Sequence, residues 1–258
     1  MSVGVRTRAP ANSGFLEGRL TAIVDDLIAA LPSSERICAG DRRGIIARYC
    51  AVLEGNFIYW MTAALLSAKS ESAISIIRDN LFEEVRDCHP GMLHKFARAS
   101  RSVPDSEDAE AVSSELTDVR LFLGNLSSVP IIAMMAFFEE FIRKFMPYLA
   151  ELAKLQGSEE FEYTRVHSIC DLVHTQELLK AFTAEMAAPA QQLDRSDETV
   201  LEGVYLLHAL IRRIIAGAAA EDTRHEGNAA LLRGTHFHSG GLAQADEAPG
   251  NRQLVDVD

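Results

Sequence analysis

Residues 167–174 read His-Ser-Ile-Cys-Asp-Leu-Val-His, and this stretch holds three side chains that commonly bind metal ions. His167, Asp171 and His174 are spaced four and three residues apart. On a helix of about 3.6 residues per turn they share one face. Imidazole and carboxylate together suit a first-row transition metal, and iron, zinc and manganese all accept these ligand types. The stretch therefore predicts a helix that carries part of a metal site, provided that other helices bring further ligands to face it.

Length and composition favour one acidic globular protein. The 258 residues are 48% hydrophobic and 24% charged, which is enough chain for one sizeable core. The formal net charge is −12 and no basic stripe is present, which argues against nucleic acid as the main partner. The cysteines have no C-x-x-C spacing and are typical of a reduced, cytoplasmic protein: Cys38, Cys50, Cys88 and Cys170.

Hydrophobic periodicity predicts an all-α fold, a bundle of about seven helices. No convincing strand, internal repeat or phosphate-binding glycine motif interrupts the pattern. The expected helices are 15–31, 42–68, 72–87, 112–126, 131–155, one that restarts after Ser158 and runs through Phe182, and 197–220. Pro147 should kink or interrupt its helix. We expect a single domain over residues 15–222, between a disordered start at 1–14 and a disordered tail at 223–258.

The helix expected at 42–68 is apolar nearly all round between Tyr49 and Met61, which is typical of a helix in the middle of a core. A membrane span is the rival interpretation, although Glu54 and Asn56 interrupt the apolar run. In a core helix Glu54 would be a buried carboxylate that needs a partner. The N-terminus shows no signal peptide.

Helical phase selects one glutamate from each of two adjacent pairs. Glu84 lies one heptad after Ile77, toward the apolar face of its helix, whereas Glu83 points away from it. Glu139 lies at the margin of an apolar stripe, and Glu140 projects to the opposite side. Periodicity therefore favours Glu84 and Glu139 as inward-facing carboxylates.

Four carboxylates would meet in the core of such a bundle: Glu54, Glu84, Glu139 and Asp171. Taken singly, each could lie on a solvated face, and a lone histidine on an apolar face is usually a core residue. Together, in a dry interior, the carboxylates would repel one another and have raised pKa values unless two divalent cations balanced them. The set therefore predicts a two-metal site.

Two motifs of this chain resemble those of the haem-oxygenase-like diiron oxidase and oxygenase family. The first is Asn80-Leu81-Phe82-Glu83-Glu84, followed ten residues after Glu84 by His94-Lys95-Phe96, and the second is the later His-x-x-x-Asp-x-x-His. The resemblance covers roughly residues 40–185 and implies a haem-oxygenase-like helical bundle. It implies Glu84, His94, His167, Asp171 and His174 as iron ligands, with Glu54 and Glu139 completing the set from flanking helices, and with Glu84 and Asp171 as catalytic residues.

One departure from the family pattern leaves a ligand open. Family members often have glycine soon after the glutamate that corresponds to Glu84, and here Val85-Arg86-Asp87 follows instead. This keeps His89 open as a substitute for His94, although a spacing of five residues matches a helix poorly. The ferritin-like alternative needs repeated Glu-x-x-His pairs, and none of these glutamates begins one.

The resemblance implies an O2-dependent enzyme that holds two Fe(II) ions, uses O2 as co-substrate and oxidises a small, amino-acid-like or fatty-acid-like metabolite in specialised-metabolite biosynthesis. N-oxygenation, desaturation, decarboxylation and C–C cleavage all stay open. One alternative is a metal-independent enzyme that resembles the thiaminase-like or quinone-cofactor-synthesising bundles. Another is a non-catalytic helical binding module. We expect a small-molecule substrate and neither nucleic acid nor membrane as a partner, and a homodimer is left open.

Overall fold

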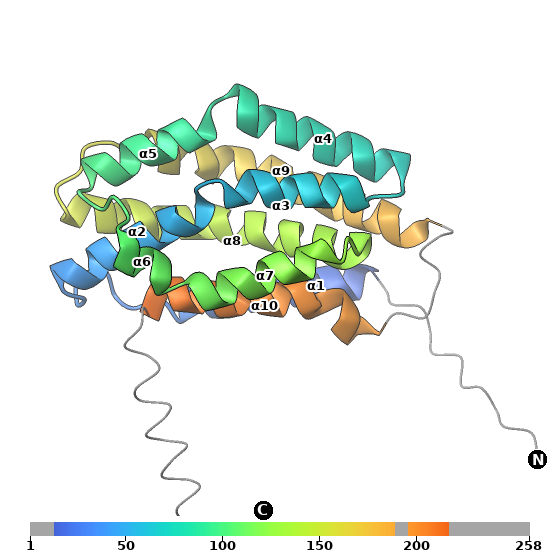
Figure 1. Ribbon diagram of the computed structural model, residues 1–258, viewed down its shortest axis with the longest axis horizontal. Coiled ribbons are helices and arrows are strands. Elements are labelled where there is room, and N and C mark those ends of the chain that lie inside the picture. Colours follow the sequence, from blue (N-terminus) through green and yellow to red (C-terminus); the bar gives the residue numbers. More distant parts are fainter. Residues whose placement is uncertain (1–12, 189–195, 217–258) are drawn as a thin grey trace, which may run out of the picture. The chain divides into compact units, whose positions relative to one another are not determined.

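The computed structural model of this protein describes residues 13–188 and 196–216, and these residues are helical without a strand (Figure 1). They belong to the first of two units into which the chain divides, Met1–Ala219. The predicted all-α bundle is thus confirmed. The helices of the described residues are α1 (Ser13–Ala29), α2 (Ala39–Leu53), α3 (Asn56–Ser67), α4 (Glu71–Arg86), α5 (His89–Ala99), α6 (Ser106–Glu110), α7 (Ser113–Gly124), α8 (Ser128–Leu155), α9 (Glu162–Ala187) and α10 (Asp197–Ala216).

Some of the predictions concern residues outside the part of the chain that the structure describes. Most of the start predicted to be disordered, and the whole of the predicted tail at 223–258, lie outside the described residues. Within the described part, α1 already begins at Ser13, two residues before the predicted helix start. The division into a helical domain and two disordered ends therefore stays a prediction.

The described part contains more helices than the seven expected, because two turns redirect the chain. Gly55 has a φ of +75°, a left-handed conformation that glycine adopts without steric cost, and it separates α2 from α3. Cys88 has a φ of 59°, and α5 starts immediately after it at His89. The short helices α5 and α6 lie between the predicted helices at 72–87 and 112–126, where no helix was expected.

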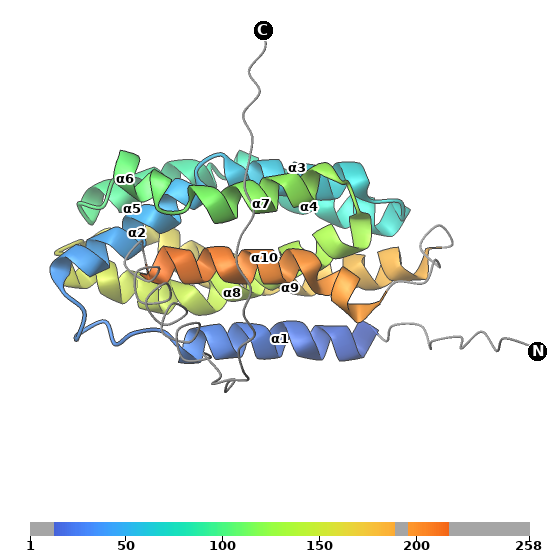
Figure 2. The same cartoon turned by 60° about the horizontal axis from the view of Figure 1, so that its bottom comes forward.

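The central helix of the bundle is α8, which is buried on nearly all sides. It packs most extensively against α9, and also against α1, α2, α3 and α10. Both views show α8 and α9 side by side (Figures 1 and 2). Pro147 does not interrupt this helix, since α8 continues to Leu155, and the alternative that it kinks the helix stays a prediction. Phe145, Met146 and Leu149 are fully buried around the proline, and their packing offsets the backbone hydrogen bond that proline removes.

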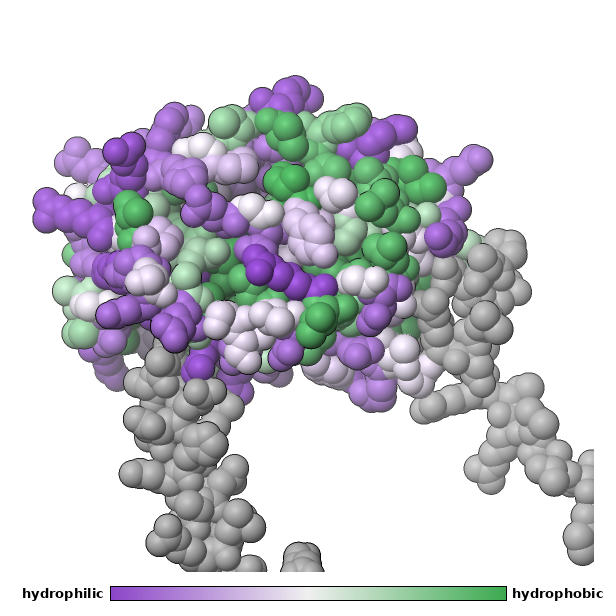
Figure 3. Space-filling model, viewed as in Figure 1, coloured by the Kyte–Doolittle hydropathy of each residue, from purple (hydrophilic) through white to green (hydrophobic). Residues whose placement is uncertain are grey.

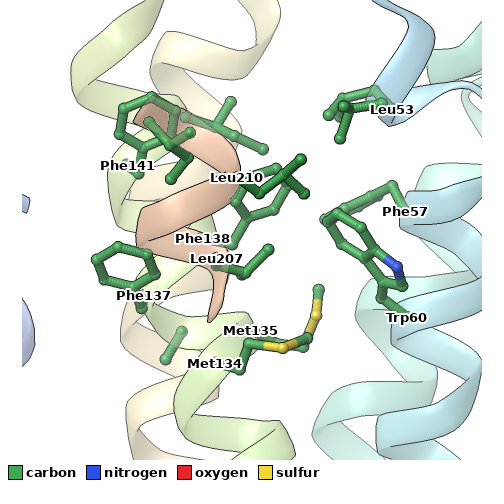
Figure 4. Packing of buried hydrophobic residues seen from close by; sticks show 14 of the residues in the cluster. Leu53, Phe57, Trp60, Met134, Met135, Phe137, Phe138, Phe141, Leu207 and Leu210 are labelled. Atoms are coloured by element: carbon green, nitrogen blue, oxygen red, sulfur yellow. The ribbon is translucent and has the colours of Figure 1, made fainter. Parts of the chain in front are cut away.

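Aromatic side chains pack closely between α3 and α8 (Figure 4). The ring of Trp60 lies 5.2 Å from that of Phe138 in an edge-to-face arrangement, and the ring of Phe57 lies 6.1 Å from the same phenylalanine. Each such buried side chain stabilises the fold by about 1.5–3 kcal/mol. This packing fixes the rotation of α8 and hence the direction in which its next residue, Glu139, points.

Glu185 joins the end of α9 to the start of α4. Its carboxylate accepts hydrogen bonds from the backbone N–H groups of Lys69 at 3.0 Å and Ser70 at 2.8 Å. These N–H groups lie at the N-terminus of α4, where a negative charge is favourable. The contact sets the antiparallel register of the two helices. As a result Glu84, near the other end of α4, faces residues 167–174 of α9.

One stretch of the described residues, Ala39–Ser67, is long and apolar enough by length and composition to cross a membrane. The structure divides it into α2 and α3, and just over half of its most apolar 18-residue window is buried inside the bundle. A core helix passes the same test, so this stretch is weak support for the membrane-spanning alternative.

Several large apolar side chains are exposed on helices of the face seen in Figure 3, namely Leu66 of α3, Phe82 of α4 and Leu121 of α7. Figure 3 shows apolar surface gathered over the part of this face where α3, α4 and α7 lie. Exposed apolar surface is typical of a face that meets another molecule. The homodimer left open by the sequence stays a prediction.

Candidate metal centre

The helix α9 turns polar side chains inward and apolar ones outward along residues 167–174. His167, Asp171 and His174 are buried, whereas Ile169 and Val173 are more than half exposed. Burying ionisable groups while exposing aliphatic ones costs free energy, so the inward polar face needs partners inside the bundle. The predicted helix with three polar groups on one face is therefore confirmed.

The first cluster joins Glu84 of α4, His89 of α5 and His167 of α9. His89 Nδ1 lies 2.8 Å from Glu84 Oε1, and the rings of His89 and His167 are 4.5 Å apart. His167 Nδ1 lies 2.8 Å from the carbonyl oxygen of Tyr163. That hydrogen bond occupies Nδ1 as a donor and leaves Nε2 as the ligand atom. One ligand atom from each of the three residues lies within 4.8 Å of the other two.

The second cluster consists of Cys170, Asp171 and His174, whose ligand atoms also lie within 4.8 Å of one another. The Cys170 thiol donates a hydrogen bond of 3.1 Å to Asp171 Oδ1. Burial, followed by the negative charge of Asp171, raises the pKa of this thiol. In this arrangement the thiol acts as a donor that holds the Asp171 carboxylate in place.

Glu84 and Glu139 connect the two clusters. Nδ1 of His174 lies 3.8 Å from Glu84 Oε1 and 3.8 Å from Glu139 Oε1. The same Glu84 oxygen contacts His89 in the first cluster. Glu84 thus lies between the two groups of ligand atoms, where its carboxylate contacts a histidine of each.

Burial raises the pKa values of two carboxyl groups of this centre. Desolvation raises the pKa of Glu139 well above its usual value, and the charges of Asp171 and Glu84 raise it further. Burial also raises the pKa of Asp171, where the Cys170 hydrogen bond and the charge of Arg143 oppose the effect only in part. Such shifts are typical of carboxylates that lack a balancing cation.

The pKa values of the two histidines in the first cluster are shifted in opposite directions. Burial lowers the pKa of His167 to about 4, although the Glu84 carboxylate acts against this shift. Burial also lowers the pKa of His89, but its contact with Glu84 outweighs that effect and the net pKa is raised. A neutral His167 has the protonation state that metal binding needs.

The unpartnered atoms of the centre fit metal ions. In the described part of the chain, no lysine or arginine forms an ion pair with Glu84, Glu139 or Asp171. Four buried atoms have no hydrogen-bond partner among the described residues, namely Glu139 Oε1, Asp171 Oδ2 and both ring nitrogens of His174. Oxygen and nitrogen ligands in this combination suit iron, manganese or zinc. Two ligands that bind one ion at about 2.1 Å and at a right angle lie about 3 Å apart, close to the spacing of His89 and Glu84.

The choice of glutamates by helical phase agrees with their placement. Glu84 and Glu139 are buried at the centre. The side chain of Glu83 is 41% exposed. Glu140 points to the other side of α8, where it accepts hydrogen bonds from Arg143 at 2.8 and 2.9 Å and pairs with Lys144 at 2.9 Å.

The prediction that Glu54 is buried is wrong. Its side chain is 56% exposed and lies 3.2 Å from His94, which is 59% exposed. The left-handed turn at Gly55 ends α2 at this point, so helical phase no longer directs Glu54 inward. Neither Glu54 nor His94 belongs to the two buried clusters, whereas His89 belongs to the first of them.

A cavity of about 530 Å³ connects the centre to the surface. Four centre residues line its inner part, namely Glu84, His89, Glu139 and His167. Its walls are mainly apolar, and its outer part includes the Glu54–His94 pair and the exposed Arg98. A largely apolar cavity of this size with a few convergent polar groups is typical of a small-molecule site.

Sequence reasoning missed two features of this region. Tyr163 and Tyr49 are buried beside the centre, and their hydroxyl groups form a hydrogen bond of 2.8 Å. The signal for Tyr163 was its place one helical turn before His167. Arg98 carried no such signal, because only the tertiary fold brings it to the cavity.

Comparisons with family models, with curated proteins and with solved structures give no match. The resemblance to the diiron family therefore rests on the residues and motifs of this chain.

Proposed function

We propose that this protein is an O2-dependent non-haem diiron oxidase or oxygenase that acts on a small metabolite. The observation that carries the proposal is the meeting of three buried carboxylates and three buried imidazoles, four of which line the inner part of an apolar cavity. Uncompensated charge of this kind is costly in a core, and divalent cations would remove the cost.

The chain offers ligands for two ions. Glu84, His89 and His167 would hold one, and Asp171, His174 and Glu139 would hold the other, with Glu84 between them. This set keeps five of the seven ligands expected from the sequence. It takes His89 in place of His94 and leaves Glu54 at the cavity mouth.

Bound iron would supply the activation of O2 and the oxidation of the substrate. The protein's own residues prepare the place where this occurs. Apolar cavity walls exclude water and orient a substrate toward Glu84 and His89. We assign catalytic roles to Glu84 and Asp171, because Glu84 stands between the clusters and Asp171 has one unpartnered buried oxygen.

Arg98 favours a substrate that carries an acidic group. It lines the outer part of the cavity, and no side chain of the described residues pairs with it. The side chains of Glu54 and His94, also at the mouth, lie 3.2 Å from each other. The Arg98 guanidinium group can donate hydrogen bonds to a substrate carboxylate, and the apolar walls further in can contact the rest of the molecule. This combination suits an amino-acid-like or fatty-acid-like substrate.

The test is an anaerobic Fe(II) titration of purified protein, followed by metal analysis and exposure to O2. We expect about two iron ions per chain, a higher melting temperature and a transient visible absorption after O2 is added. Asp171→Asn should bind less iron while its helix content stays unchanged. Asp79→Asn, which changes an exposed aspartate on α4, serves as the matched control.

Other results would point elsewhere. Iron that neither binds nor raises the melting temperature would overturn the proposal. Catalytic activity after complete metal removal would favour the thiaminase-like or quinone-cofactor-synthase-like alternative. The absence of both metal binding and catalysis would favour a helical binding module.

A further inference from the structure

His174 lies between carboxylates on both sides of its ring. Its Nδ1 faces the centre, 3.8 Å from an oxygen of Glu84 and 3.8 Å from an oxygen of Glu139. Its Nε2 faces the other way, 3.6 Å from Glu83 Oε2. The imidazole itself is only 2% exposed, whereas Glu83 is 41% exposed. Glu83 thus joins a buried ring of the centre to the surface of α4.

A histidine that binds a metal through one ring nitrogen usually donates the N–H of the other to a carboxylate or a carbonyl group. That outer hydrogen bond fixes the tautomer and the orientation of the ring. In this centre His167 follows the rule, because its Nδ1 is bound to the carbonyl oxygen of Tyr163. For His174 the outward nitrogen is Nε2, and Glu83 is the carboxylate nearest to it.

We propose that Glu83 is the positioning residue of His174: it accepts the N–H of Nε2 and thereby directs Nδ1 toward Glu84 and Glu139. The proposal rests on the proposed function in one respect, namely that a metal ion is what Nδ1 binds. The present 3.6 Å contact is longer than a hydrogen bond. Because the Glu83 side chain is 41% exposed, we expect a rotation of that side chain to close the gap.

Among the residues that the structure describes, no lysine or arginine pairs with Glu83. The two nearby arginines of α4 pair with their own neighbours, Arg78 with Asp79 and Arg86 with Asp87. Among the described residues, the ion-pair contact of Glu83 is with His174. Its chain neighbour Phe82 is an exposed apolar residue. Of the two glutamates of α4 that contact His174, Glu83 is therefore the one that faces Nε2, whereas Glu84 faces Nδ1.

The test compares Glu83→Ala and Glu83→Gln with the wild-type protein. Nitrogen-15 NMR of labelled histidines reports the tautomer in the metal-free protein, and the His174 signals are assigned by their loss in His174→Gln. We expect wild-type His174 to carry its proton on Nε2 and Glu83→Ala to lose this preference. Metal titration should show an affinity loss of about 10–100-fold for Glu83→Ala. Glu83→Gln keeps an acceptor oxygen, so it should retain the tautomer and lose less affinity.

Asp79→Ala is the matched control, since it removes one exposed negative charge from the same helix, one turn before Glu83. It should leave both tautomer and affinity unchanged. Wild-type affinity in Glu83→Ala, or an equal loss in Asp79→Ala, would overturn the proposal. A proton on Nδ1 of wild-type His174 would also overturn it. A wild-type protein that binds no metal would overturn the proposed function, and the NMR measurement would still decide whether Glu83 orients His174.

Discussion

Nδ1 of His89 lies 2.8 Å from Oε1 of Glu84 inside the bundle, although a spacing of five residues would not bring them together on one continuous helix. The contact exists because the chain turns between them. α4 ends at Arg86, Cys88 takes up a left-handed φ of 59°, and α5 starts at His89. The turn brings the first residue of α5 against the last turn of α4.

This relationship predicts that His89, not His94, is needed for metal binding. His89→Ala removes a buried imidazole that contacts Glu84, so we expect metal affinity to fall by at least about 100-fold. Loss of a residue that only hydrogen-bonds to a metal ligand lowers metal affinity by about 10–100-fold, and loss of a ligand itself should cost at least as much. His94→Ala changes an exposed residue paired with Glu54 and should keep wild-type affinity. Titration with Fe(II) or Co(II) under anaerobic conditions measures both. Loss of binding in His94→Ala alone would favour the ligand set of the diiron family.

Two adjacent glutamates of α8 give a second prediction. Glu139→Gln should raise the free energy of unfolding of the metal-free protein at neutral pH and abolish its stabilisation by metal. Burial raises the pKa of Glu139, so its contribution to stability is greatest below its unfolded pKa of about 4.3 and is lost as pH rises toward the folded value. Because glutamine does not ionise, the advantage of the variant should grow with pH. Urea unfolding in the presence of a chelator, from pH 4 to 8, measures this difference in the free energy of unfolding between the variant and the wild-type protein.

Glu140→Gln is the control for that experiment. Glu140 pairs with Arg143 and Lys144 on the outer side of α8, so this variant should lose about 1 kcal/mol or less and still be stabilised by metal. If the two variants behaved alike, Glu139 would not differ from a surface glutamate.

The placement of Glu84, Glu139 and the residues of α9 could be predicted from the sequence because each lies within a long helix. There the spacing of apolar residues sets the direction of every side chain. For Glu54 this reasoning failed, and His94, which only the family resemblance implied as a ligand, is exposed. Glu54 follows the last residue of α2, and the turn at Cys88 sets a new phase for α5, which carries His94. Both turns depend on single backbone angles that hydrophobic periodicity does not report.

The cavity could not be predicted in the same way. It is bounded by residues from several helices, and Arg98 becomes part of it through the packing of α5 onto α2 and α9. Pairing of Tyr49 with Tyr163, 114 residues apart along the chain, depends on the same long-range packing.

That tyrosine pair gives a third prediction, which concerns stability alone. Tyr49→Phe or Tyr163→Phe leaves one buried hydroxyl without its partner, and each should cost about 1–3 kcal/mol in the free energy of unfolding. The double variant removes both hydroxyls and should cost little more than either single change. Urea unfolding of the four proteins forms a double-mutant cycle. Strictly additive losses would show that the hydroxyls do not interact.

Arg98, which has no ion-pair partner among the described residues, gives the last prediction, that the metal-free protein binds decanoate more tightly than decanol. Arg98→Gln should weaken decanoate binding by about tenfold or more, since a hydrogen bond to a charged group contributes about 1.5–3 kcal/mol, and should leave decanol binding unchanged. Isothermal titration calorimetry measures both ligands. Lys95→Gln is the control, because Lys95 lies on the same helix but pairs with Glu162 at 3.7 Å outside the cavity lining. Equal decanoate affinity in Arg98→Gln and wild type would show that Arg98 does not bind the acidic group, whatever metal the centre holds.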